Sequence, residues 1–165
     1  LWAILMWLNI LAVRGESVAG ILAAHWARFG RNYYSRHDFE AIAVDKAEAM
    51  MAALRARLAS LPGTAPEGLE VEAADDFAYT DPVDGSVATA QGVRLLFKGG
   101  SRAVFRLSGT GTEGATLRLY LERYVAGPEG LLADPQAALA PVIRAAHAVA
   151  GIKAHTGRET PDVVT

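Results

Sequence analysis

A succession of strand candidates, with helical segments before and after it, constrains the fold more than any other feature of the sequence. The candidates cover about residues 69–79, 87–97, 102–108 and 116–125. Asp84-Gly85 and Gly99-Gly100 are hairpin signals between them. Strands in succession with helices at either end are typical of an antiparallel sheet that packs helices on one face. The sequence therefore predicts an α+β fold.

Two helices are predicted before the first strand. Residues 1–14 are apolar on most sides, and the segment ends near Arg14 and Gly15, as a helix terminus should. Ser17 is expected to cap a second helix over residues 18–29, which Gly30 ends. The apolar run at the start is too short for a membrane span of about 20 residues, and it predicts a buried helix. We interpret the chain as a fragment of a larger protein.

Residues 33–44 alternate aromatic and polar side chains, which predicts a strand. Asp45 and Glu48 then match a capping box, the start of an amphipathic helix that should end near Leu61. The segment from residue 31 onward is thus expected to open with a strand followed by a helix.

A last helix is predicted after the strands. Asp134 is in position to cap it, and Pro135 occupies its first position, where the missing N–H is tolerated. The helix should continue to about residue 154, with Pro141 marking a kink or a restart.

A loop rich in glycine and hydroxyl residues joins the last two strand candidates, with an arginine at each end. Its polar and glycine residues are Arg106, Ser108, Gly109, Thr110, Gly111, Thr112, Glu113, Gly114, Thr116 and Arg118. Glycines allow successive N–H groups to turn toward one anion, while hydroxyl groups and guanidinium forks add donors. This composition indicates a phosphate site, although an ordinary hairpin with solvated arginines explains the same residue types. The Gly-x-x-x-x-Gly-Lys-Ser/Thr pattern of a P-loop is absent.

Composition limits the other chemistry that the chain can perform. The net charge of −2 gives no general attraction to nucleic acid or to an anionic membrane, so neither is expected as a partner. The chain has no cysteine, and its four histidines are too scattered for a metal-ligand spacing. Asp75, Asp76, Asp81 and Asp84 lack a calcium-loop pattern and are expected to form turns. We therefore expect a binding loop, with no catalytic residue and no metal site in this chain.

Three segments, in the same order along the chain, resemble the last domain of phosphoglucomutases in the α-D-phosphohexomutase family. They are residues 25–40, 81–86 and 106–120, the last reading Arg-Leu-Ser-Gly-Thr-Gly-Thr-Glu-Gly-Ala-Thr-Leu-Arg-Leu-Tyr. The resemblance implies that residues 1–30 are the C-terminal helices of a preceding, third domain. It also implies that residues 31–165 form the fourth, phosphate-binding domain, a small antiparallel sheet with two packed helices similar to the TATA-box-binding-protein fold.

The resemblance also implies a function for the parent enzyme, which would be cytoplasmic. Such an enzyme interconverts glucose 1-phosphate and glucose 6-phosphate through glucose 1,6-bisphosphate, using a phosphoserine and a Mg²⁺ site in domains that precede this chain. The partners of this chain would be a phosphorylated hexose and the upstream domains of the same polypeptide. The implied contacts to the phosphate that is not reacting are Arg106, Ser108, Gly109, Thr110, Gly111, Thr112 and Arg118.

Two alternatives remain open at this point. One is a family member with another hexose specificity, because the sugar-selecting loop would lie upstream of Leu1. The other is a stand-alone anion-binding module without catalysis. Trp2 and Trp7 argue against the second alternative, because an isolated module would expose them. Under the favoured reading, the fragment alone is expected to have no mutase activity.

Overall fold

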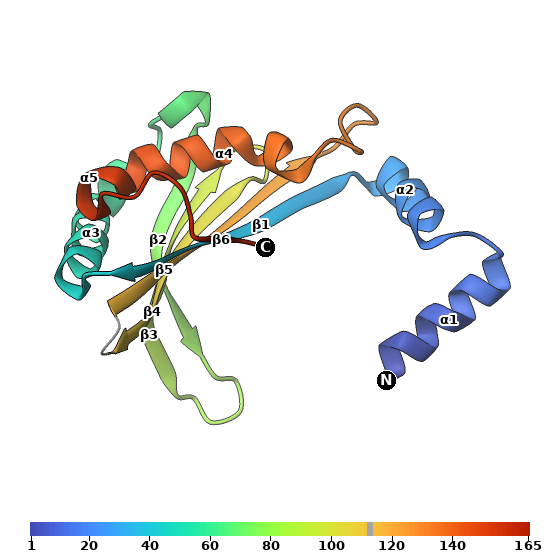
Figure 1. The fold of residues 1–165 in the computed structure, drawn as a ribbon, viewed down its shortest axis with the longest axis horizontal. Helices are drawn as coiled ribbons and strands as arrows, with labels where there is room; N and C mark the ends of the chain where they lie inside the picture. Colours follow the sequence, from blue (N-terminus) through green and yellow to red (C-terminus); the bar gives the residue numbers. More distant parts are fainter. Residues whose placement is uncertain (112–113) are drawn as a thin grey trace. The chain divides into compact units, whose positions relative to one another are not determined.

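A computed structural model describes residues 1–111 and 114–165, and its central feature is a six-stranded antiparallel sheet (Figure 1). The order of the strands across the sheet is β2-β3-β4-β5-β1-β6. Their bounds are β1 Arg31–Ile42, β2 Val71–Thr80, β3 Val87–Phe97, β4 Arg102–Gly111, β5 Gly114–Val125 and β6 Val163–Val164. The predicted α+β fold is confirmed.

The chain divides into two compact units. The smaller unit consists of Leu1–Asn32 and Val125–Ala133, and the larger unit consists of Tyr33–Tyr124 and Asp134–Thr165. The larger unit contains the sheet together with helices α3 (Val44–Arg57), α4 (Pro135–Ala150) and α5 (Ile152–Thr156). Two short 3₁₀ helices, η1 (Leu58–Ser60) and η2 (Pro66–Gly68), follow α3.

The helices of the larger unit cover one face of the sheet (Figure 1). Alternate strand residues, among them Phe105, Leu117 and Leu119, are fully buried on that face. Side chains of α3 and α4 fill the same core; those with the least exposure are Ala47, Met50, Met51, Leu54, Leu139, Val142, Ala145 and Ala146. Because successive strand residues point to opposite faces, the intervening residues project from the other, uncovered face. We call that surface the open face.

The start of α3 differs from the predicted capping box. The N-cap residue is Ala43, no side chain caps the helix, and Asp45 lies within the first turn. β1 ends at Ile42, directly after Ala41 with its positive φ of 51°, so the chain enters the helix two residues earlier than the capping motif requires. Asp45 still suits the positive end of the helix dipole. The capping-box prediction is wrong. The predicted helix end near Leu61 agrees with the structure, in which α3 continues at Arg57 directly into η1 and η1 ends at Ser60.

The final helix confirms the predicted cap, and of the two alternatives predicted at Pro141, a kink or a restart, it excludes the restart. Asp134 caps α4, since its Oδ1 accepts a hydrogen bond from the Ala137 N–H at 2.9 Å. Pro141 lies within the continuous helix and does not restart it. The break comes instead at Gly151, which adopts the left-handed conformation (φ 60°) that glycine tolerates best, and α5 follows.

The smaller unit contains α1 (Trp2–Arg14) and α2 (Val18–Phe29), close to their predicted bounds. Gly15 ends α1 with a φ of 62°, and Ser17 caps α2 by accepting a hydrogen bond from the Gly20 N–H at 3.1 Å. No residue of α1 is buried, so the expectation of a buried helix is not met within this chain. Among the described residues, no single helix has the length and hydrophobicity to cross a membrane. The α1–α2 pair, bent by 87°, meets that criterion only when the two helices are taken together.

Candidate functional site

Arg106 and Arg118, the two arginines predicted to hold a phosphate, are cross-strand neighbours. Arg106 in β4 lies directly opposite Arg118 in β5. Directly opposite residues of an antiparallel pair project from the same face, with Cβ atoms about 4.5–5.5 Å apart. Their sequence neighbours Phe105, Leu117 and Leu119 are buried beneath the helices, so both arginines project from the open face. Two guanidinium groups are thus presented side by side.

The pairing is electrostatically unfavourable in the absence of an anion. Like charges directly opposite each other in a sheet are destabilising. Among the residues that the structure describes, Arg106 has neither an ion pair nor a side-chain hydrogen bond, and its side chain is exposed. Local arrangements that cost stability without a visible gain are characteristic of binding sites. The arginine pair therefore has the chemistry of an anion site.

Within residues 1–111 and 114–165, Asp38 is the acidic group that forms an ion pair with one of these arginines. Its side chain is only 6% exposed, and its Oδ2 lies 4.0 Å from Nε of Arg118. Its other oxygen, Oδ1, accepts a hydrogen bond from Nε of Arg36 at 2.9 Å. Arg36 and Asp38 alternate with the buried His37 along β1, which places them on the open face beside β5.

Gly92 makes room for Arg106. A Cβ atom added at Gly92 in β3 would lie 2.7 Å from Cγ of Arg106 and 2.9 Å from the carbonyl oxygen of Phe105. Such distances are far below a normal carbon contact of about 3.5–4.0 Å. The absence of a side chain at this position therefore lets the stem of Arg106 lie across the neighbouring strand.

The predicted loop between the arginines is largely extended strand. β4 continues to Gly111 and β5 begins at Gly114, with an irregular register between Ser108 and Gly111. Ser108 lies opposite Thr116, two residues along from the arginine pair and on the same face. The strand candidates 102–108 and 116–125 left residues 109–115 as the loop, so the strands extend further than predicted. The hairpin is longer and its turn is shorter.

Two glycines of this hairpin adopt the backbone conformation that the sequence suggested for them. Gly109 and Gly114 have φ values of 63° and 95°, which other residues rarely adopt. Gly114 also approaches β1 closely, since a Cβ there would lie 2.8 Å from the carbonyl oxygen of Ile42. Thr110 and Gly111 belong to the end of β4, whereas Thr112 lies outside the described residues.

Arg106, Ser108 and Arg118 are therefore brought onto one face of the sheet, with Gly109 close by in the chain. Three further residues at this site, Arg36, Asp38 and Gly92, were not identified from the sequence. The alternation of residues 33–44 placed Arg36 and Asp38 on the same side of a strand. It gave no sign that this strand would lie beside β5, because the pairing joins segments about eighty residues apart.

The four aspartates that the sequence suggested as turn residues have structural partners, but Asp75 and Asp76 lie in β2, where Asp76 pairs with Arg55, and only Asp81 and Asp84 lie in a turn. Asp75 forms two hydrogen bonds with Arg94, at 2.8 and 2.6 Å, and these lower the pKa of the Asp75 carboxyl group. Asp81 and Asp84 accept hydrogen bonds from the backbone N–H groups of Val83 and Ser86, as turn residues do. Within residues 1–111 and 114–165, no three histidine, aspartate or glutamate side chains are grouped so that they could hold one metal ion.

Two histidines lie in the interior of the larger unit. His37 is buried. Its Nε2 lies 2.9 Å from Oε1 of Gln136, and this hydrogen bond joins β1 to α4. His147 packs its ring against Phe39, with centroids 5.7 Å apart. Burial lowers the pKa of His147 below its ordinary value, and the nearby His37 lowers it further. His37 projects away from the arginine pair, toward α4, and His147 belongs to α4 itself.

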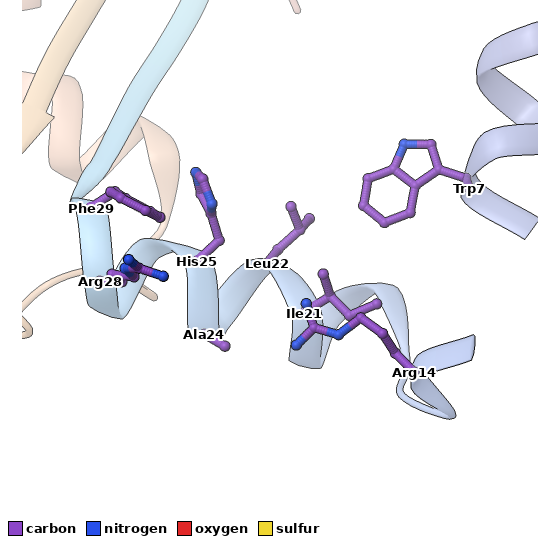
Figure 2. Close-up of a pocket in the computed structure, with 8 residues that line it drawn as sticks. All are labelled: Trp7, Arg14, Ile21, Leu22, Ala24, His25, Arg28 and Phe29. Carbon is purple, nitrogen blue, oxygen red and sulfur yellow. The ribbon is translucent and has the colours of Figure 1, made fainter. Parts of the chain in front are cut away.

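A separate cavity lies in the smaller unit, and Figure 2 shows the side chains around it. Its volume is about 460 Å³. The lining residues are Trp7, Arg14, Ile21, Leu22, Ala24, His25, Arg28 and Phe29. Most of this surface is apolar, and it continues into the exposed apolar residues of α1. The cavity contains none of the residues predicted to bind phosphate.

Comparison with protein families gives one match that covers most of the chain. Residues 31–162 match the family model described as Phosphoglucomutase-1, C-terminal domain. The matched segment begins with the first residue of β1 and ends just before β6.

Curated proteins and solved structures agree with this match. The chain is 58% identical to the phosphoglucomutase of Rhizobium radiobacter and 46% identical to human phosphoglucomutase-1, and each alignment covers all of this chain and 30% of the relative. The open form of parafusin, a phosphoglucomutase from Paramecium, superimposes with a TM-score of 0.87 at 39% identity, covering 99% of this chain and 29% of the other. The chain thus spans about 30% of the length of the curated relatives it matches.

Proposed function

Because the chain belongs to the phosphoglucomutase family, we propose that its open face binds the phosphate group of a hexose phosphate that is not reacting. The observation that supports this proposal most directly is the cross-strand pairing of Arg106 with Arg118. Two planar guanidinium groups on one surface match the oxygen atoms of a phosphate, which carries about −1.5 to −2 charges near neutral pH. Binding such a dianion offsets the repulsion between the arginines.

Hydroxyl and backbone donors of the hairpin would complete this site. Ser108 lies on the same face as the arginines, and Gly109 has the positive φ that lets a backbone N–H turn toward an anion. The proposed contacts are Arg106, Ser108, Gly109, Thr110, Gly111, Thr112 and Arg118, of which Thr112 lies outside the described residues.

Such a site holds the substrate without performing chemistry on it. Binding energy from the remote phosphate positions the far hydroxyl group and helps to close the cleft over it. Because the contacts recognise phosphate alone, either end of the sugar can be accepted. This property suits the conversion of glucose 1-phosphate to glucose 6-phosphate through a bisphosphate that must bind in two orientations.

The proposal assigns the rest of the catalytic apparatus to parts of the protein that lie outside this chain. We place the phosphoserine and the Mg²⁺ site in domains that precede residue 1, in a cytoplasmic enzyme. The proposed domain boundary lies near residue 30, with residues 31–165 as the phosphate-binding domain. Its support is the family match, which begins at residue 31. The exposed apolar side of α1 and the cavity beside it would then be covered by the rest of the preceding domain, to which residues 1–30 belong.

Steady-state kinetics of the full-length protein with glucose 1-phosphate test this function. Arg106→Ala and Arg118→Ala are each expected to raise KM about 10–100-fold, since a charge-assisted hydrogen bond contributes roughly 1.5–3 kcal/mol. kcat should fall as well, because the same contacts assist closure. Arg102→Ala is the matched control, because Arg102 is also an exposed arginine of β4 but pairs with Glu122 at 2.5 Å. If all three variants had the same KM and kcat as the wild type, the proposal would be contradicted.

A further inference from the structure

We propose that Asp38 is a positioning residue for phosphate binding, which acts by orienting the guanidinium group of Arg118. This inference rests on the proposed function. Asp38 itself would not contact the substrate. Its carboxylate would fix the direction in which Arg118 presents its outer N–H groups to the phosphate.

The geometry around Arg118 carries this inference. Nε of Arg118 is buried and, among the described residues, has no hydrogen-bond partner. Oδ2 of Asp38 lies 4.0 Å away, which is too long for a hydrogen bond but close enough for an ion pair. The side chain of Arg118 nevertheless remains 41% exposed. One edge of the group is therefore turned into the protein beside a carboxylate, while other parts of it reach solvent.

The shape of a guanidinium group explains why this orientation matters. Its five N–H donors lie in one plane and in fixed directions. When the Nε edge faces Asp38, the edge formed by the two terminal nitrogen atoms stays available for a bidentate contact with phosphate. Without the carboxylate, the long side chain would sample other rotamers, and ordering it on binding would cost affinity.

Asp38 is itself held firmly by the C-terminal segment. Its carbonyl oxygen accepts a hydrogen bond from the Asp162 N–H at 2.8 Å, and Oδ2 of Asp162 accepts one from the Glu40 N–H at 2.8 Å. Arg158 then binds both Oδ1 of Asp162 and the carbonyl oxygen of Glu40, each at 2.8 Å. The C-terminal segment thus fixes the part of β1 that carries Asp38, as a positioning residue requires.

A carboxylate beside an anion site also repels the anion, and Arg36 reduces this cost. The 2.9 Å hydrogen bond from Nε of Arg36 to Oδ1 balances the charge of Asp38. The charges of Arg106 and Arg118 then remain uncompensated, which matches the charge of a phosphate dianion. Asp38 can therefore orient one guanidinium group without cancelling the attraction of the pair.

Kinetics of the full-length protein with glucose 1-phosphate test the role of Asp38 through a double-mutant cycle with Arg118. Asp38→Asn is expected to raise KM about tenfold, within the range of coupling between contacting residues. In the Arg118→Ala background, the same substitution should leave KM unchanged, because the group that it orients is absent. A purely structural role for Asp38 predicts the same increase in both backgrounds, and that result would overturn the inference.

Two further variants complete the design. Asp75→Asn removes a carboxylate that pairs with Arg94 on the same sheet, and it is expected to leave KM unchanged. If Asp38→Asn does not fold, Asp38→Glu keeps the charge, moves it by one methylene group and serves in the same cycle. An unchanged KM in Arg118→Ala would remove the proposed function itself. An increase there, with no effect of the Asp38 substitution in the wild-type background, would remove only the role of Asp38.

Discussion

Arg106 and Arg118 face each other across β4 and β5, and of the two only Arg118 has an acidic neighbour among the described residues, Asp38. The pair is therefore asymmetric. Nε of Arg118 lies 4.0 Å from the buried carboxylate of Asp38, whereas Arg106 projects into solvent from a strand beside Gly92. This asymmetry leads to separate predictions for stability and for binding.

Removing the charge of Arg106 should stabilise the unliganded protein while weakening phosphate binding. Arg106→Gln relieves a like-charge contact, which contributes roughly 0.2–1 kcal/mol in a sheet. We expect the melting temperature of the full-length protein to stay constant or rise slightly at low salt, and the difference should shrink at high salt as the repulsion is screened. A clear decrease in the melting temperature at low salt would show that Arg106 has a stabilising partner.

Substitution of Gly92 should disturb Arg106 without touching its charge. Gly92→Ala places a methyl group against Cγ of Arg106 and the backbone of Phe105, and it should destabilise the fold by about 1–3 kcal/mol. Because Arg106 must then shift, KM for glucose 1-phosphate should rise about tenfold, since small misplacements of binding groups are costly. Gly127→Ala is the control, because nothing lies within 4 Å of its added Cβ. Equal KM values for the two variants would contradict the steric role of Gly92.

The lowered pKa of His147 predicts a stability that decreases toward acid pH. In the unfolded chain this histidine takes up a proton as the pH falls below about 6.5, whereas burial and the nearby His37 keep the folded form neutral to lower pH. The contribution of His147 is therefore complete above that pH and is lost as the pH decreases. His147→Gln should reduce the fall in melting temperature of the 165-residue chain between pH 7.5 and pH 5.5. Parallel curves for the two proteins would contradict this.

The exposed apolar surface of α1 should make the isolated chain associate with itself. Trp2 is 86% exposed and Ile4 is 61% exposed, and large apolar patches of this kind drive association. Ile4→Glu should shift sedimentation of the 165-residue chain toward the monomer. Asn9→Glu, which adds the same charge at an exposed polar position of the same helix, should have a smaller effect. A chain that is monomeric at every concentration would contradict this prediction.

The strands and most helix ends were predictable because local signals determine them. Ser17, Gly30 and Asp134 act at the helix ends where the sequence placed them. The predicted strand over 87–97 has the observed bounds of β3. The capping box at Asp45 and the restart at Pro141 failed because tertiary packing overrides a local motif: β1 enters α3 directly, and α4 accommodates the proline.

The candidate site was predictable only in part. The two arginines and the glycines between them stand out in the sequence because they belong to a single hairpin. The contributions of Asp38 and Gly92 depend on strands β1 and β3 lying on either side of that hairpin, and no local pattern encodes this order. The register of Arg106 with Arg118 likewise depends on the length of the turn, which was predicted to be longer.

The most direct measurement is a crystal structure of the full-length protein with glucose 1,6-bisphosphate bound. We predict that nitrogen atoms of Arg106 and Arg118 lie about 2.7–3.1 Å from oxygen atoms of one phosphate group, with Nε of Arg118 still facing Asp38. A phosphate bound elsewhere, with both guanidinium groups left in solvent, would contradict the assignment of this hairpin as the phosphate site.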